Sequence, residues 1–183
     1  PGGSGSKQAA ALEEEGRDMV KQFVEAGGGY VGICAGAFLA ASNYSWSLAI
    51  SNHKTFCETI DVSGIGRKSM WFRGGSAPVT MELTDEGRTI LGDFEGIFEV
   101  RYQNGPIMSP MGREGLGNFR SLAHFRSEVS KYKPQEGTMI NTPAVIVGEY
   151  GNGRVLCISP HPESTDALNQ LVRNAVRWTA RRR

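Results

Sequence analysis

The chain has 183 residues, of which 39% are hydrophobic and 21% are charged. This length suits one domain with a full hydrophobic core. The 20 Lys and Arg nearly balance the 19 Asp and Glu, which argues against a nucleic-acid-binding or membrane-surface protein. No apolar run is long enough to cross a bilayer, and no signal peptide opens the sequence.

The three cysteines, Cys34, Cys57 and Cys157, show neither CxxC spacing nor a cluster with histidine. A disulfide framework and a zinc site are therefore poorly supported. We expect free thiols, a reducing compartment such as the cytoplasm, no metal and no cofactor.

The first third of the chain alternates helix and strand patterns. The Gly-rich residues 1–6 are predicted to form a loop, and their composition alone favours a linker. Apolar residues recur at helical spacing over 8–26, and a run of three glycines ends that helix. A strand over 30–33 and a helix to about residue 41 follow, and then a candidate short strand over 48–50.

The remainder is richer in strand patterns. These cover residues 56–62, 79–83, 97–102 and 122–129, and a hairpin covers 143–150 and 154–158. Thr84 is predicted to cap a short helix, residues 109–121 are predicted to be irregular, and a last helix begins near residue 164. Together these elements predict an α/β fold with a mostly parallel sheet and antiparallel additions.

Cys34 lies between an apolar strand pattern and a helix, with Gly32 and Gly36 on either side. Strand, Gly-x-nucleophile-x-Gly and helix together are typical of a nucleophile elbow. A Cβ at either glycine is expected to crowd the sharp turn, and the helix N-terminus favours a thiolate. The alternative is a buried structural cysteine in an ordinary turn.

A nucleophilic cysteine needs a base, and the sequence offers three histidines: His53, His124 and His161. His161 follows the apolar strand 155–158, so a parallel sheet would place it at the same edge as Cys34. Glu163 is close enough in sequence to orient the imidazole and to stabilise its charged form. For the other two histidines we favour ordinary core or surface roles.

The opening Pro-Gly-Gly, Gly32-Ile-Cys-Ala-Gly36 and His161-Pro-Glu163 resemble the class I glutamine amidotransferase superfamily. The amidotransferase-like domain at the N-terminus of some biotin–protein ligases is a closer match, through 27–38, 101–106 and 153–163. The resemblance implies a flavodoxin-like three-layer sandwich, with residues 1–183 as one N-terminally incomplete domain. The strand–helix–strand unit that this family carries ahead of Pro-Gly-Gly is absent, so we expect a further segment or a partner chain to complete the sheet.

The resemblance also implies a site, and it favours an oxyanion loop over a linker for residues 1–3. Its triad is Cys34, His161 and Glu163, with backbone amides of Gly3 and Ala35 as oxyanion donors. The candidate substrate contacts are Gly2, Phe38, Tyr102, Asn104 and Gly105, with turn roles open for the last three. Glutaminases of this class carry Gln where this chain has Phe38, which argues for a more apolar pocket than one for glutamine.

The function predicted from these residues is a cysteine-dependent amidase or amidotransferase-like hydrolase that acts on a small-molecule amide through a thioester. The alternative is a non-catalytic regulatory domain of the biotin–protein ligase N-terminal type, which binds a ligand or a partner. A related redox or small-aldehyde enzyme is the least favoured, because such proteins generally place their acidic partner elsewhere.

Overall fold

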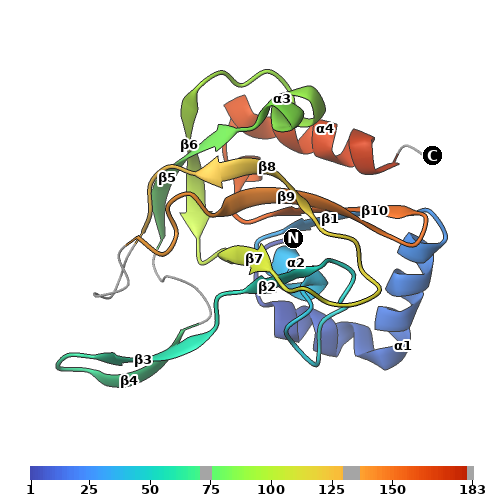
Figure 1. The fold of residues 1–183 in the computed structure, drawn as a ribbon, viewed down its shortest axis with the longest axis horizontal. Helices are drawn as coiled ribbons and strands as arrows, with labels where there is room; N and C mark the ends of the chain where they lie inside the picture. Colours follow the sequence, from blue (N-terminus) through green and yellow to red (C-terminus); the bar gives the residue numbers. More distant parts are fainter. Residues whose placement is uncertain (71–75, 130–136, 181–183) are drawn as a thin grey trace.

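The computed structural model describes residues 1–70, 76–129 and 137–180 (Figure 1). The helices of this part are α1 (Gly5–Glu25), α2 (Ala35–Ala40), α3 (Asp85–Leu91) and α4 (Asn169–Ala180). The strands are β1 (Gly29–Ile33), β2 (His53–Thr55), β3 (Glu58–Val62), β4 (Gly66–Met70), β5 (Ser76–Leu83), β6 (Ile97–Gln103), β7 (Met108–Pro110), β8 (Arg120–Phe125), β9 (Pro143–Tyr150) and β10 (Gly153–Ile158). None of these helices is long and apolar enough to cross a membrane.

Six strands form one sheet in the order β1-β10-β9-β8-β5-β6. β1 and β10 run parallel, whereas every other neighbouring pair in this sheet is antiparallel. The α/β class is confirmed, but the described sheet is mixed and mainly antiparallel rather than mostly parallel. The connections explain the difference. β9 and β10, for example, are joined across residues 151–152 alone, and a parallel pair needs a much longer crossover.

Helices cover both faces of the sheet, which gives the expected three layers (Figure 1). Alternation along β10 supplies both cores, because successive side chains of a strand point to opposite faces. Cys157 belongs to the buried cluster that contains Val24 of α1 and Leu39 of α2. Leu156 belongs to the cluster that contains Leu171 of α4. β10 is therefore buried on both faces, and it carries the chain from this double core to residue 161.

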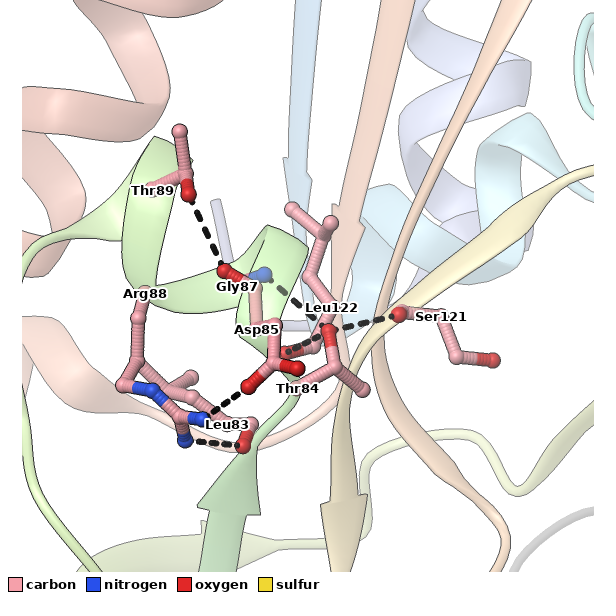
Figure 2. A network of polar contacts seen from close by, with 8 residues as sticks. All are labelled: Leu83, Thr84, Asp85, Gly87, Arg88, Thr89, Ser121 and Leu122. Carbon is pink, nitrogen blue, oxygen red and sulfur yellow. Dashed lines mark hydrogen bonds and ion pairs between the residues drawn. The ribbon is translucent and has the colours of Figure 1, made fainter.

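Thr84 attaches the start of α3 to β8 (Figure 2). Its hydroxyl accepts a hydrogen bond from the Gly87 N–H at 3.0 Å, which confirms the predicted N-cap. Its own N–H donates to the carbonyl oxygen of Leu122 at 2.9 Å. A Cβ on Gly87 would lie 1.9 Å from that same oxygen, so only glycine allows α3 to approach β8 this closely.

The chain opening differs from the predicted loop, because α1 already begins at Gly5. Ser4 makes this early start possible, since its side chain accepts a hydrogen bond from the Lys7 N–H. The linker interpretation is wrong for this segment, which is partly buried: an added Cβ on Gly5 would lie 3.1 Å from both the Ala35 oxygen and Phe38. The α1 backbone is also kinked at Glu13, where φ is 56°.

Three further boundaries differ from prediction. Residues 48–50 are not a strand; the nearby strand is β2, which pairs with β7. β3 pairs with β4 as a separate hairpin that extends away from the main sheet (Figure 1). The last helix begins at Asn169 rather than near residue 164, because two short 3-10 turns over 162–164 and 166–168 precede it.

Candidate active site

Cys34 occupies the turn between β1 and α2 with φ 51° and ψ −101°. A positive φ is uncommon for a residue with a side chain, and such strain often accompanies a functional site. The Cys34 N–H donates to the carbonyl oxygen of Ile158 at 2.8 Å, which ties this turn to the end of β10. Cys34 is 4% exposed, so the residue is nearly enclosed.

The two glycines beside the cysteine have different roles. A Cβ on Gly32 would lie 2.6 Å from the carbonyl carbon and oxygen of Gly36, so strand and helix meet too closely for a side chain there. A Cβ on Gly36 would find its nearest atoms at 3.7 Å, which is an ordinary contact. The predicted crowding is confirmed at the first glycine and is wrong at the second. The Tyr30 hydroxyl also donates to the Gly36 oxygen at 2.8 Å and braces the turn.

The Cys34 sulfur has two described partners. It donates to the backbone oxygen of Gln103 at 3.5 Å, and its interaction with the His161 side chain is the largest of the causes that raise the pKa of that histidine. Although β6 and β1 are at opposite ends of the strand order, the end of β6 reaches this site because the sheet is curled (Figure 1). The His161 N–H donates to the Arg101 oxygen at 2.7 Å, so the same strand also holds the histidine backbone.

His161 and Glu163 form a close pair directly after β10. The Nδ1 atom of His161 lies 2.6 Å from Oε1 of Glu163. Gly2 lies against the imidazole, because a Cβ at this glycine would be 2.8 Å from the ring atom Cε1. Since Nδ1 faces the carboxylate, Nε2 is the ring nitrogen that is available to Cys34.

Charges in this cluster reinforce one another. The hydrogen bond with Cys34 and then the one with Glu163 raise the pKa of His161 to about 9, against the opposing effect of burial. Burial raises the pKa of Glu163, but its hydrogen bonds and the nearby histidine outweigh that effect and lower it overall. At neutral pH the pair is therefore imidazolium and carboxylate.

The predicted oxyanion donors lie next to these groups. Ala35 is the first residue of α2, and amides in the first turn of a helix have no partner within the helix. Gly3 has φ +122°, follows Gly2 beside the histidine ring, and has open space where a Cβ would be. The directions of these two amides toward a substrate stay a prediction.

A pocket of about 460 Å³ adjoins the site. Its walls are Gly3, Ser4, Gly5, Ser6, Phe38, Tyr44, Trp46, Cys57 and Asn104. Two of the predicted substrate contacts, Phe38 and Asn104, are therefore in its wall. Tyr44, Trp46 and Cys57 were not predicted: the first two come from a loop without a recognisable pattern, and Cys57 lies just before β3, in a segment predicted to be a strand.

Two other predicted substrate contacts have a turn role in the structure. Tyr102 is fully buried, and its hydroxyl donates to the Gly105 oxygen at 2.7 Å. A Cβ on Gly105 would lie 2.1 Å from the oxygen of Ser159, so the turn after β6 is pressed against the chain just before His161. These residues help to position the histidine segment.

A second hollow, of about 470 Å³, lies between the end of α1 and α4 and includes Phe23, Gly29 and Val176. It adjoins the first residue of β1, whereas Cys34 follows the last residue of that strand. It is therefore remote from the predicted chemistry. Within the three described ranges, no group of three or more His, Cys, Asp or Glu residues could hold a metal ion.

The family model described as biotin-protein ligase, N terminal, matches residues 1–180. A biotin–protein ligase of Schizosaccharomyces pombe is 22% identical over 169 residues, which cover 89% of this chain and 25% of that protein. The chain thus spans about a quarter of this curated relative.

Solved structures show the same fold at low identity. A ThuA-like protein from Bacteroides uniformis is 18% identical with a TM-score of 0.62, over 91% of this chain and 64% of that one. A ThuA-like protein from Parabacteroides merdae is 16% identical with a TM-score of 0.55, over 91% and 65% of the two chains. At such identities the likeness concerns the fold alone.

Proposed function

This chain belongs to the biotin-protein ligase N-terminal family, and within that family we propose that it is a cysteine-dependent amidase. The observation that carries the proposal is one connected arrangement. Cys34, at a strained turn, interacts with His161 strongly enough to raise the pKa of that histidine, and the Nδ1 atom of His161 lies 2.6 Å from Glu163. Nucleophile, base and orienting acid in this order are what covalent acyl transfer requires.

In the proposed first step, His161 already holds the thiol proton as the imidazolium, and the Cys34 sulfur attacks the amide carbonyl carbon as the thiolate. A carbon–sulfur bond forms as the carbonyl π electrons move to oxygen. The tetrahedral intermediate then collapses and its carbon–nitrogen bond breaks. His161 returns the proton to nitrogen, which leaves as ammonia or an amine, and a thioester remains on Cys34.

In the second step, water attacks the thioester carbonyl and gives a proton to His161. The carbon–sulfur bond breaks, a carboxylic acid leaves, and the thiolate is regenerated. Glu163 stabilises the imidazolium in both steps. The amides of Gly3 and Ala35 are the proposed oxyanion donors, and a donor of this kind is typically worth roughly 3–4 kcal/mol in the transition state.

The test is ammonia release from a panel of primary amides by purified protein. Wild type and Phe23→Ala should turn over the same substrates, since Phe23 lies in the hollow that is remote from Cys34. Cys34→Ala and His161→Asn should be slower by at least about a hundredfold. Equal rates for wild type and Cys34→Ala would overturn the proposal.

A second candidate function is a regulatory domain that binds a ligand without chemistry. Two observations favour it: the sulfur donates to a backbone oxygen, and it is 4% exposed. A buried, satisfied thiol is also what a structural cysteine shows. Ligand binding that is the same in wild type and Cys34→Ala, with no turnover in either, would favour this candidate over the amidase.

A further inference from the structure

The pocket beside Cys34 carries information about the substrate. Three of its residues, Gly3, Phe38 and Asn104, adjoin residues that contact the reacting groups. Gly3 follows the glycine that lies against the His161 ring, and Asn104 follows the residue whose oxygen accepts from the thiol. The Phe38 N–H donates to the Cys34 oxygen at 3.2 Å. An amide held at the sulfur therefore has this pocket beside it as space for a substituent.

Aromatic side chains make up much of this pocket. Tyr44 and Trp46 are stacked, with ring centroids 4.6 Å apart and an interplanar angle of 16°. Phe38 is tilted against Tyr44, with centroids 6.4 Å apart. A flat apolar group could stack on such a surface, and a volume of about 460 Å³ is in the range of small-ligand pockets.

Three hydroxyl groups of the wall, those of Ser4, Ser6 and Tyr44, already have hydrogen-bond partners within the chain. The Ser4 hydroxyl lies 3.2 Å from the Ser6 hydroxyl and also caps α1. The Tyr44 hydroxyl lies 2.6 Å from the Thr55 hydroxyl. The aromatic faces of Phe38, Tyr44 and Trp46 offer an apolar recognition surface beside these hydroxyls.

Charge is the second discriminating property. No Lys, Arg, Asp, Glu or His is among the residues that line this pocket in the described ranges. The ammonium and carboxylate of a free amino acid such as glutamine would lose water there without gaining an ionic partner, which is costly. A neutral substituent avoids this cost.

We infer that the site takes a neutral primary amide whose acyl group carries a flat aromatic ring, and that the ring binds against Phe38, Tyr44 and Trp46. This inference rests on the proposed amidase function for its chemistry, but the binding step is separate from turnover. Cys57 is an exposed member of the same wall. A bound ring should therefore shield its thiol from alkylation.

The experiment measures alkylation of Cys57 by N-ethylmaleimide in Cys34→Ala protein, by intact mass, with phenylacetamide or glutamine present. Phenylacetamide should slow labelling at least about fivefold at saturation, and glutamine at the same concentration should not. Equal protection by both compounds, or none by phenylacetamide, overturns the inference. The Cys34→Ala variant cannot form a thioester, so this assay measures binding alone. Protection by phenylacetamide, with no turnover of that amide by the wild-type protein, would count against the amidase function and not against the aromatic binding site.

Two variants locate the bound ring, with phenylacetamide binding measured by isothermal titration calorimetry so that both Trp46 and Cys57 can be changed. Trp46→Ala should weaken phenylacetamide binding by at least about tenfold. Should that variant unfold, Cys57→Trp fills the same pocket from an exposed position and should have the same effect. Phe23→Ala, in the remote hollow, is the matched control and should leave binding unchanged. Loss of binding in Phe23→Ala, with none in Cys57→Trp, overturns the assignment.

Discussion

Ile33 and Ile158 are paired in the parallel ladder between β1 and β10. This pairing brings the two halves of the candidate site together, because Cys34 and His161 each follow shortly after one member of the pair. The Cys34 N–H donates to the Ile158 oxygen at 2.8 Å and extends the ladder by one step. Residues that are far apart in sequence thus meet at one end of two buried strands.

His161 should titrate well above an ordinary histidine. Its pKa is raised to about 9, with the Cys34 hydrogen bond as the largest cause and the Glu163 hydrogen bond as the next. We therefore expect Cys34→Ala to lower this pKa, and Glu163→Gln to lower it by a smaller amount. Histidine ring resonances followed by NMR from pH 5 to 11 measure both effects.

His124 is the internal control in that titration, because burial lowers its pKa and it does not face Cys34. Its titration should be the same in wild type and in both variants. The raised pKa of His161 also determines how this residue's contribution to stability changes with pH. A folded pKa raised above the unfolded value stabilises the fold at low pH, and this contribution is lost as the pH rises from about 6.5 toward 9. An unchanged His161 pKa in Cys34→Ala contradicts the interaction between His161 and Cys34.

Gly32 and Gly36 should respond differently to the same substitution. Gly32→Ala places a Cβ 2.6 Å from the backbone of residue 36, so the free energy of unfolding should fall by about 1–3 kcal/mol. Gly36→Ala meets nothing closer than 3.7 Å and should change stability little. Urea unfolding of the two variants measures the difference. Equal losses would mean that the turn is not packed as described.

Thr84 should contribute measurably to stability through the cap of α3. Thr84→Ala removes the acceptor for the Gly87 N–H and should cost about 1 kcal/mol. Thr89→Ala is the matched control on the same helix, because the exposed Thr89 hydroxyl only donates to the Asp85 oxygen (Figure 2). Its cost should stay within about 0.5 kcal/mol. Thermal unfolding of both variants measures the two stability costs. Similar costs in Thr84→Ala and Thr89→Ala would contradict the capping role of Thr84.

His53 should make the fold sensitive to acid. It is fully buried, and burial lowers its pKa to about 4. A buried histidine with a lowered pKa stays neutral while the unfolded chain binds a proton, so stability falls as the pH falls from about 6.5 to 4. The loss should reach roughly 3 kcal/mol.

His53→Gln should remove this dependence, because glutamine does not titrate. Unfolding free energies at several pH values between 4 and 7 give the slope for each protein. His124→Gln is the control for a histidine that is less buried. If the unfolding free energy changes with pH equally in wild type and His53→Gln, buried His53 is not the source of the acid sensitivity.

The sequence predicted those features that depend on local pattern. The elbow around Cys34, the Thr84 cap and the hairpin of β9 and β10 each have a short signature of glycine, capping residue or alternating strand. The order of strands in the sheet has no such signature. The balance of parallel and antiparallel pairs was therefore predicted wrongly, since it depends on contacts between distant segments.

Backbone contributions to the site were likewise not predictable. The oxygens of Gln103 and Arg101 contact Cys34 and His161 whatever their side chains are. The early start of α1 was missed because six residues rich in glycine and serine resemble a loop until Ser4 is recognised as a cap. The pocket residues Tyr44 and Trp46 were missed because stacking in a loop leaves no periodic trace.

The most direct test of the proposed nucleophile is the rate at which iodoacetamide alkylates Cys34 at neutral pH. Cys57→Ser protein is used so that the exposed thiol does not react, and Cys157 is fully buried. We expect one label at Cys34, and a rate at least about tenfold lower in His161→Asn than with His161 present, because the imidazolium stabilises the attacking thiolate. His124→Asn should leave the rate unchanged. No labelling of the folded protein, or equal rates with and without His161, would contradict the assignment of Cys34 as an activated nucleophile.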